Sequence, residues 1–334
     1  MKKIKIIAEI GVNHNGNLNL ALEMIEAAAK SGADIVKFQT YTSENLILKQ
    51  IPKTNYQKKN SKLSESQYSM LKRLELSRKY YDEIIKSCKK NRVEFLSSAF
   101  DIENLKFLLN LNIKRIKIPS GEITNLPYLE FIKKTNLPII LSTGMANLKE
   151  ISDALKILSR NSKKMNKITL LHCNSEYPTP FRDVNLLAMV ELGKIFKIKF
   201  GYSDHTLGIE VPIAAAALGA SIIEKHFTLN RRLKGPDQRI SLLPKEFNEM
   251  VSKIRNIEQS LGEINKKVTK SEFKNIKYVR KSIVANQNIK KGEFFTIKNL
   301  TTKRPGNGIS PMLWHKILGK KSKYNYKKND LIKL

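Results

Sequence analysis

Eight short apolar runs rich in β-branched residues recur along the first 228 residues of this 334-residue chain, and segments between them leave room for amphipathic helices. Strands that are apolar along most of their length and alternate with helices are typical of a parallel sheet covered by helices. Eight such units predict a closed (β/α)8 barrel. The runs cover residues 4–10, 34–40, 94–100, 115–120, 138–144, 168–173, 198–204 and 221–228.

Helical periodicity is clear in two of the intervening segments, whose shared apolar faces are Leu20, Met24, Ile25 and Ala28, and Ile151, Ala154, Leu155 and Leu158. Periodicity alone does not distinguish a closed barrel from a doubly wound open sheet. Polar residues follow nearly all eight apolar runs, and (β/α)8 enzymes place their active sites at the C-terminal ends of their strands. This distribution favours the barrel.

The chain changes character after about residue 262, where the charged residues 266–277 lack a strong apolar period. This segment is expected to be a linker or an exposed helical connector. Beyond it, the apolar run 282–285 and the turn-like stretches 290–293 and 304–308 predict a small module of short strands. We therefore expect a catalytic barrel over residues 1–262, a linker over 263–279 and a second domain over 280–334. A domain this small is marginally stable alone, so it is expected to dock on the barrel or on a partner chain.

The chain carries 61 basic and 30 acidic side chains, a net charge of +31. Such a balance raises the possibility of a nucleic-acid or other polyanion-binding protein. However, the lysines are scattered over predicted helix faces and loops, and no nucleic-acid motif accompanies them. A solvated basic surface, whose positive field would attract an anionic substrate, is the favoured interpretation.

The two cysteines, Cys88 and Cys173, are 85 positions apart and provide neither a disulfide framework nor a multi-cysteine metal site. A reducing compartment is therefore expected. The first apolar run stops at Glu9, too early for a signal peptide or a membrane span. These features predict a cytoplasmic protein with no membrane partner.

Two histidines stand at the ends of neighbouring predicted strands: His205 follows the seventh run, and His226 lies in the eighth. A lone histidine is more often a structural hydrogen-bonding residue than a ligand. Adjacent strand ends would, however, bring these two imidazoles to one rim, and Asp237 follows soon after in the sequence. Two neutral imidazoles with a carboxylate or water suit a divalent transition metal.

A second set of residues is cationic and hydroxylic. Lys37 and Lys117 lie inside apolar runs, where an ammonium group is costly unless it meets an anion. Ser120 and the Ser142-Thr143-Gly144 turn would add hydroxyls and free backbone amides, so the combination resembles a phosphate cradle. The alternatives are lysines that extend to solvent from the barrel end or pair with structural carboxylates.

Glu9 ends the first run and precedes an Asn15-Gly16 turn, after which Asn17 is a candidate helix cap. A carboxylate at a barrel mouth could hold or deprotonate a sugar hydroxyl. Glu9 is therefore a candidate catalytic residue.

With these residues in place, the whole chain resembles the N-acetylneuraminate (sialic acid) synthase family, which includes legionaminic and pseudaminic acid synthases. The resemblance rests on AEIGVNHNG (8–16), VKFQT (36–40), KIPSGE (117–122), LSTGM (141–145), EYPTP (176–180), SDHT (203–206), EKHFT (224–228) and GPD (235–237). KRPGNGI (303–309) is similar to a motif of the antifreeze-like (SAF) domain in these synthases.

The resemblance implies roles for particular residues. A divalent metal, Mn²⁺ in preference to Mg²⁺ or Co²⁺, would be bound by His205 and His226. Phosphoenolpyruvate would be contacted by Lys37, Lys117, Ser120, Ser142 and Ser203, with Asn174 as a further candidate and Ser175 as its alternative. The amino sugar would be surrounded by Glu9, Gln39, Tyr177 and Asp237, and its N-acyl group would be recognised by Arg304 of a domain-swapped partner subunit. Gln238 departs from the histidine that many relatives carry, which puts any role of that histidine in doubt here.

The implied reaction condenses phosphoenolpyruvate, N-acetylmannosamine and water to a nonulosonic acid and phosphate, by metal-assisted C–C bond formation and C–O cleavage. A 2,4-diacetamido-2,4,6-trideoxymannose substrate, as in a legionaminic acid synthase, is the alternative. A related barrel acting on a phosphorylated sugar is a further possibility, against which Arg304 weighs.

Overall fold

The computed structural model describes residues 3–55, 57–58, 65–159 and 165–333. The chain divides into two compact units, Met1–Gly262 and Glu263–Leu334, and each is described by itself.

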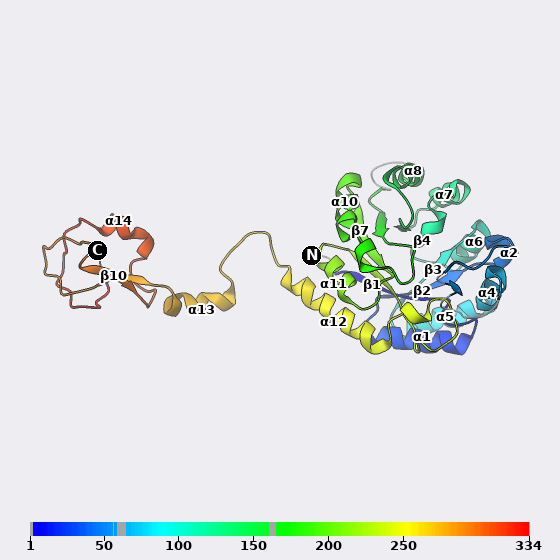
Figure 1. Ribbon diagram of the computed structural model, residues 1–334, viewed down its shortest axis with the longest axis horizontal. Helices are drawn as coiled ribbons and strands as arrows, with labels where there is room; N and C mark the ends of the chain where they lie inside the picture. The colour runs from blue at the N-terminus through cyan, green and yellow to red at the C-terminus, as the bar shows by residue number, and fades with distance from the viewer. Residues whose placement is uncertain (1–2, 56, 59–64, 160–164, 334) are drawn as a thin grey trace. The chain divides into compact units, whose positions relative to one another are not determined.

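The strands of the first unit form a closed barrel in which each strand pairs with the next and β8 pairs with β1 (Figure 1). This closure confirms the predicted (β/α)8 barrel and excludes the open sheet. The strands are β1 Lys5–Gly11, β2 Ile35–Thr40, β3 Glu94–Ala99, β4 Ile116–Ile118, β5 Ile139–Ser142, β6 Ile168–His172, β7 Lys199–Asp204 and β8 Ile222–His226.

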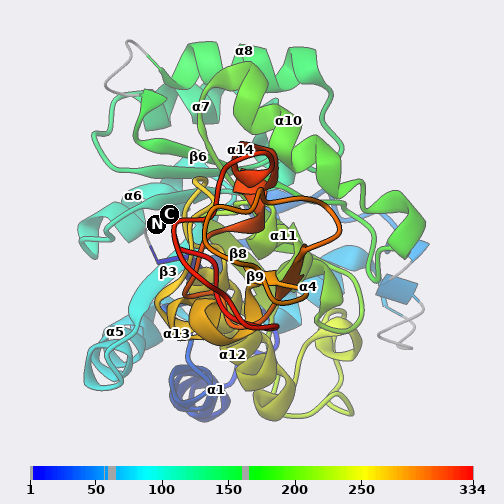
Figure 2. The same cartoon turned by 90° about the vertical axis from the view of Figure 1, so that its left-hand side faces the viewer.

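Helices surround the strands (Figure 2). The α-helices of this unit are α1 Leu18–Lys30, α2 Ser43–Leu46, α4 Gln67–Leu74, α5 Tyr81–Lys90, α6 Ile102–Asn110, α7 Leu126–Lys133, α8 Leu148–Leu158, α10 Leu186–Phe196, α11 Glu210–Ala217 and α12 Pro244–Ser260. Single 3-10 turns are η1 Arg78–Tyr80, η2 Ser120–Glu122, η3 Phe181–Asp183 and η4 Gln238–Ile240. Among the helices of the described ranges, none is both long and apolar enough to span a membrane.

The predicted helix faces pack on the barrel. All four apolar residues predicted for α8 are buried. In α1, Met24, Ile25 and Ala28 are buried as predicted, but Ala21 completes the buried face and Leu20 lies at its edge. The Asn15-Gly16 turn is present, with positive φ at both residues, and the Asn17 side chain caps α1 by accepting a hydrogen bond from the Leu20 amide at 3.0 Å.

Alternation along the strands divides the barrel into layers. Outward residues such as Ile6 and Val36 join the cluster that packs against the helices. A separate cluster of strand residues forms an apolar floor inside the barrel, made of Ile7, Ile35, Leu96, Ile140, Leu171 and Ile222. Because side chains repeat with period two, the residue two positions later on each strand lies above this floor, toward the C-terminal rim. Several of these residues are polar: Glu9, Lys37, Ser98, Ser142 and Glu224.

The second unit contains helix α13 Lys270–Val279, an antiparallel pair β9 Ser282–Ala285 and β10 Leu300–Lys303, the turn η5 Pro311–Leu313 and helix α14 Trp314–Ile317. Its core is small and is built from Ile283, Ala285, Ile289, Phe295, Leu300, Ile317, Tyr326 and Ile332. Helix α13 occupies part of the segment predicted as a linker or helical connector.

Candidate active site

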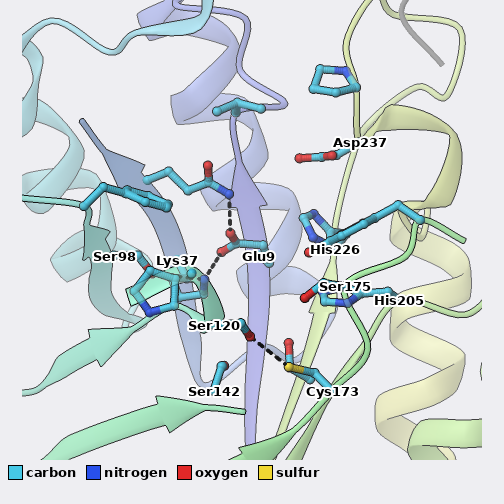
Figure 3. A pocket seen from close by; sticks show the side chains of 18 of the residues that line it. Glu9, Lys37, Ser98, Ser120, Ser142, Cys173, Ser175, His205, His226 and Asp237 are labelled. Carbon is cyan, nitrogen blue, oxygen red and sulfur yellow. Dashed lines mark hydrogen bonds and ion pairs between the residues drawn. The ribbon is translucent and has the colours of Figure 1, made fainter. Parts of the chain in front are cut away.

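A cavity of about 340 Å³ opens at the C-terminal ends of the barrel strands. Every predicted site residue of the barrel except Asn174 lines it. In Figure 3, Ser142 and Cys173 lie at one end of the view and Asp237 at the other, with Glu9 and Lys37 between them. The position agrees with the placement of active sites in (β/α)8 enzymes.

Four buried charges form a network above the apolar floor. The Lys37 ammonium lies 2.9 Å from Glu9 Oε2 and 3.5 Å from Glu224 Oε1. Lys117 Nζ donates to the same Glu224 Oε1 at 3.2 Å, and the Ser203 hydroxyl donates to it at 2.9 Å. Glu224 was not among the predicted site residues. Glu224 could have been predicted from its position two residues before His226 on β8, because residues two apart on a strand face the same side, here the barrel interior.

The network keeps its central members charged. Burial alone would raise the pKa of Glu224, but Lys117 and Lys37 lower it to about 2. Burial alone would lower the pKa of Lys37, but Glu224 and Glu9 raise it instead. Lys117 has a lowered pKa, because burial and repulsion from Lys37 outweigh the attraction of Glu224. A bound anion beside Lys117 would therefore favour its charged form.

Glu9 and Asp237 are two buried carboxyl groups with raised pKa values. Burial is the main cause for both. The nearby Glu9 adds to the effect on Asp237, whose pKa is raised to about 7. The Gln39 amide also donates to Glu9 Oε1 at 3.2 Å. A carboxyl group with a pKa near 7 can both give and accept a proton at neutral pH.

Hydroxyl groups line the cavity beside Lys117. The Ser142 hydroxyl is buried without a hydrogen-bond partner. The Gly144 amide donates to Ser120 Oγ at 3.0 Å, and a Cβ added at Gly144 would lie 2.5 Å from Ser175 Oγ and 2.8 Å from Ser120 Oγ. The glycine thus leaves space between the Ser175 and Ser120 hydroxyls and the Cys173 thiol, as a bound phosphate or carboxylate requires.

His205 and His226 form an imidazole pair whose ring centroids are 5.5 Å apart. His205 Nδ1 lies 2.5 Å from the Asn174 carbonyl oxygen, so Nδ1 carries the hydrogen and Nε2 keeps a free lone pair. Burial lowers the pKa of His205 to about 4, and burial together with His205 also lowers the pKa of His226. His226 Nδ1 is buried without a hydrogen-bond partner.

This donor set fits a divalent transition metal, because both imidazoles are neutral near pH 7 and one of them is oriented by a backbone carbonyl. Within the described residues, no group of three His, Cys, Asp or Glu side chains forms a cluster that could hold a metal. A metal at the His205–His226 pair would therefore leave coordination positions to substrate and water. The Tyr177 ring packs 4.1 Å from the His205 ring and completes this side of the wall.

The structure separates the adjacent candidates Asn174 and Ser175. The Asn174 side chain donates to the Asp183 carbonyl oxygen at 2.8 Å and does not line the cavity, whereas Ser175 does. Asn174 thus contributes through its backbone carbonyl, which orients His205.

Gln238 directly follows Asp237 and is fully buried. Its amide nitrogen donates to the Asn13 carbonyl oxygen at 2.8 Å, and its amide oxygen accepts from the Thr228 hydroxyl. The residue is therefore a structural tie between the loops that follow β1 and β8.

Arg304 lies in the C-terminal unit, on a loop anchored to β9. The Ser282 hydroxyl donates to the Pro305 carbonyl oxygen at 2.6 Å and accepts from the Gly308 amide at 2.8 Å. The Gly306 amide donates to the Lys277 carbonyl oxygen of α13 at 2.7 Å. Arg304 is thus an exposed guanidinium on a well-braced turn.

An ion pair lies on the opposite face of the strands that carry the imidazoles. Lys225 Nζ is 2.5 Å from Asp204 Oδ2 and also donates to the Thr206 carbonyl oxygen at 2.5 Å. Neither side chain is exposed. This pair ties β7 to β8 one residue before each histidine.

Comparison with known proteins gives consistent results along the chain. A model of the NeuB family matches residues 24–266, and a model of the SAF domain matches residues 280–334. The chain is 54% identical to N,N'-diacetyllegionaminic acid synthase of Campylobacter jejuni, with 100% of both chains covered. It is 38% identical to pseudaminic acid synthase of Helicobacter pylori, with 97% of this chain and 95% of the relative covered. A crystal structure of N-acetylneuraminic acid (sialic acid) synthetase from Leptospira borgpetersenii matches with a TM-score of 0.72 and 36% identity, covering 82% of this chain and 90% of that chain.

Proposed function

Because the chain belongs to the NeuB family, we propose that it condenses phosphoenolpyruvate with the open-chain form of an amino sugar to give a nonulosonic acid and inorganic phosphate. Membership of the family makes the chain an enzyme and sets aside the polyanion-binding alternative. One cavity is lined by two buried lysines, the Ser142 hydroxyl, which has no hydrogen-bond partner, and a pair of neutral imidazoles. This convergence is the observation that carries the proposal.

We propose 2,4-diacetamido-2,4,6-trideoxymannose as the sugar, which makes the product N,N'-diacetyllegionaminic acid. The motifs alone placed N-acetylmannosamine first. The 54% identity with the legionaminic acid synthase of C. jejuni, against 38% with the pseudaminic acid synthase of H. pylori, supports the alternative.

The residues of the cavity have separate tasks in this proposal. Lys117 and Lys37 hold the phosphate, while Ser120, Ser142 and Ser175 donate to the anionic oxygens. C3 of phosphoenolpyruvate attacks the sugar aldehyde to form the C–C bond. Water then adds at C2, and the C2–O bond to phosphate breaks. Asp237 and Glu9 orient sugar hydroxyls and exchange protons with them.

We propose Mn²⁺ as the cofactor, held by His205 and His226; when bound, it would supply a Lewis acid for the aldehyde oxygen. If His205→Ala and His226→Ala remain folded by circular dichroism, each should lose most Mn²⁺ binding by titration calorimetry and nearly all turnover. Full activity of either variant in metal-stripped buffer would reject this assignment.

The direct test supplies purified protein with Mn²⁺, phosphoenolpyruvate and a panel of aldehyde sugars that includes both candidates and a phosphorylated sugar. Phosphate release and the nonulosonic acid, identified by mass spectrometry, should both appear with the diacetamido sugar. Release of phosphate without a new nine-carbon product, or no turnover with any sugar, would contradict the proposal.

We also propose a homodimer in which Arg304 completes the partner's sugar site. The braced turn and the small core of the C-terminal unit support this role, because a rigid guanidinium is suited to a carbonyl acceptor. Mixing His226→Ala and Arg304→Ala subunits should regenerate one intact site per heterodimer. Demonstrated subunit exchange without any return of activity would place Arg304 in the site of its own chain. A cytoplasmic location, consistent with the free thiols of Cys88 and Cys173, completes the proposal.

A further inference from the structure

A thiol stands among the hydroxyl groups of the cavity wall. Cys173, the first residue after β6, lines the cavity, and its Sγ lies 3.2 Å from Ser120 Oγ, a contact that Figure 3 marks with a dashed line. A Cβ added at Gly144 would also lie 3.2 Å from this sulfur. Cys173 is only 5% exposed, so the cavity is the route by which a reagent reaches it.

The space beside this sulfur has an unsatisfied polar group of its own. Ser142 lines the same cavity and is 3% exposed, and its hydroxyl is buried without a hydrogen-bond partner. A buried hydroxyl of this kind indicates that a bound molecule supplies the missing partner. Under the proposed function that molecule is phosphoenolpyruvate, whose anionic oxygens would lie beside Ser120 and Ser142. An atom added to the Cys173 sulfur would therefore compete with phosphoenolpyruvate for space.

Lys117 provides a cationic neighbour for the thiol, because the two groups are close enough to interact electrostatically. A lysine ammonium favours the thiolate, the form of cysteine that reacts with oxidants. Cys88, the other cysteine of the chain, has the opposite surroundings. It is 1% exposed in the apolar cluster that packs the helices against the strands, and burial raises its pKa to about 12. Reactivity is therefore expected at Cys173 and not at Cys88.

We propose that Cys173 is an oxidation site, at which hydrogen peroxide that enters the cavity reversibly blocks the binding of phosphoenolpyruvate. The inference rests on the proposed function for the identity of the excluded ligand, and it goes beyond that function by assigning a modification site. The added oxygen would occupy space beside Gly144 and Ser120, where the anion of the substrate would lie.

The chemistry of this site needs only the peroxide and a thiol reductant. The Cys173 sulfur attacks one peroxide oxygen, the O–O bond breaks, and the leaving hydroxide takes up the thiol proton to form water. The sulfur is thereby oxidised to a sulfenic acid while the peroxide is reduced. One reductant thiol then forms a mixed disulfide with release of water, and a second thiol displaces Cys173 from that disulfide.

The test exposes the purified wild-type protein, with Mn²⁺ present, to hydrogen peroxide, stops the reaction with catalase and measures turnover. Most of the turnover should be lost and should return with dithiothreitol. Dimedone, which traps sulfenic acids, should label Cys173 and leave Cys88 unlabelled in peptide mass spectrometry. Phosphoenolpyruvate at about ten times its Kd should slow this labelling about 10-fold, because only the unoccupied protein exposes the sulfur. Absence of label at Cys173, or labelling that phosphoenolpyruvate does not slow, would overturn the proposal.

Two matched variants, Cys173→Ala and Cys88→Ala, each remove one thiol. Each is compared with its own untreated rate, because Cys173 borders the substrate. Peroxide should leave the rate of Cys173→Ala unchanged, whereas Cys88→Ala should lose turnover as the wild type does. Equal losses in Cys173→Ala and the wild type would reject Cys173 as the site. If Cys173→Ala is inactive or unfolded, the labelling of the wild-type protein decides.

Failure of the proposed function has a different signature. Untreated wild-type protein would then show no turnover with any sugar of the panel. The dimedone labelling would still decide whether Cys173 is the oxidation site, since it does not depend on turnover.

Discussion

Two buried ion-pair systems lie on opposite faces of the same barrel strands and differ in what their charges face. The exterior pair, Lys225 and Asp204, is sealed between β7 and β8, and the Thr206 carbonyl oxygen also accepts from Lys225. The interior network around Glu224 borders the cavity, and Glu224 Oε2 has no hydrogen-bond partner. Burial of charge therefore does not identify a functional group in this molecule. The buried charges that border the cavity and are incompletely paired, such as Glu224, are the functional candidates.

The largest effect on stability is expected from breaking the exterior pair. Lys225→Met leaves the Asp204 carboxylate buried without its cation, which should lower the free energy of unfolding by about 3–5 kcal/mol in urea titrations. Replacing both partners, as in Lys225→Met with Asp204→Leu, should recover much of the loss, because two apolar groups need no compensation. A single variant within about 1 kcal/mol of the wild type would remove the structural role.

Asp237 sharpens the comparison because it is a buried carboxyl group for which burial outweighs the attraction of Lys37. Its pKa in the folded protein, about 7, lies above its ordinary value of 3.8, so the folded state holds the proton more tightly. The associated stability is fully present below about pH 4 and is lost as the pH rises through 7. Asp237→Asn cannot ionise, so its stability relative to the wild type should rise by up to about 4 kcal/mol between pH 4 and pH 8.

Parallel urea titrations of the two proteins at several pH values measure this difference. A relative stability that stays constant across the range would mean that Asp237 keeps an ordinary pKa. Glu224→Gln is the contrasting variant, because the lysines already lower the pKa of Glu224 to about 2 and its relative stability should change little from pH 5 to pH 8.

Removal of one interior cation should affect binding more selectively. Lys37→Ala deletes a charge-assisted contact of about 1.5–3 kcal/mol, so KM for phosphoenolpyruvate should rise about 10- to 100-fold while KM for the sugar changes little. Lys37→Arg should rescue only in part, because a planar fork does not replace a compact ammonium. Lys3→Ala, at an exposed ion pair with Asp34, is the control and should leave both constants unchanged. Equal effects of Lys37→Ala on the two substrates would argue against a phosphate contact.

The smallest expected effect comes from filling the space beside Gly144, between the Ser120 and Ser175 hydroxyls, without changing any charge. In Gly144→Ala, the new methyl group would approach Ser175 and Ser120 too closely, and KM for phosphoenolpyruvate should rise about 10-fold. Gly121→Ala is matched, because Gly121 also lines the cavity but its Cβ would meet nothing within 4 Å. Identical kinetics of the two variants would show that the space at Gly144 is not used by substrate.

The sequence predicted the fold more completely than the cavity. Every predicted strand is present, although some are shorter: the run 115–120 becomes β4 Ile116–Ile118, because Pro119 lacks an N–H and Ser120 begins a 3-10 turn. Most site residues could be predicted because strand ends of a barrel share one rim. Glu224 could not be predicted in the same way, because its partners Lys37 and Lys117 lie on other strands. The sequence of β8 alone does not indicate which cations face it inside the barrel.

Two further features depended on three-dimensional placement. Met70 and Leu74 have the spacing of an ordinary core helix face, and only the closed barrel turns that face toward the cavity. Asn174 and Ser175 are neighbours in the turn after β6, so backbone geometry rather than residue type decides which side chain reaches the cavity.

Strand β8 has a consequence for the ways in which this chain can change length. Glu224, Lys225 and His226 are consecutive, and their tasks alternate between the cavity, the exterior pair and the cavity again. A one-residue insertion or deletion would exchange the two faces, burying an imidazole beneath the helices and turning a lysine into the cavity. Insertions should accordingly be accepted in the exposed loops of the barrel, whereas Ile222–His226 should tolerate substitutions one at a time but no change in length.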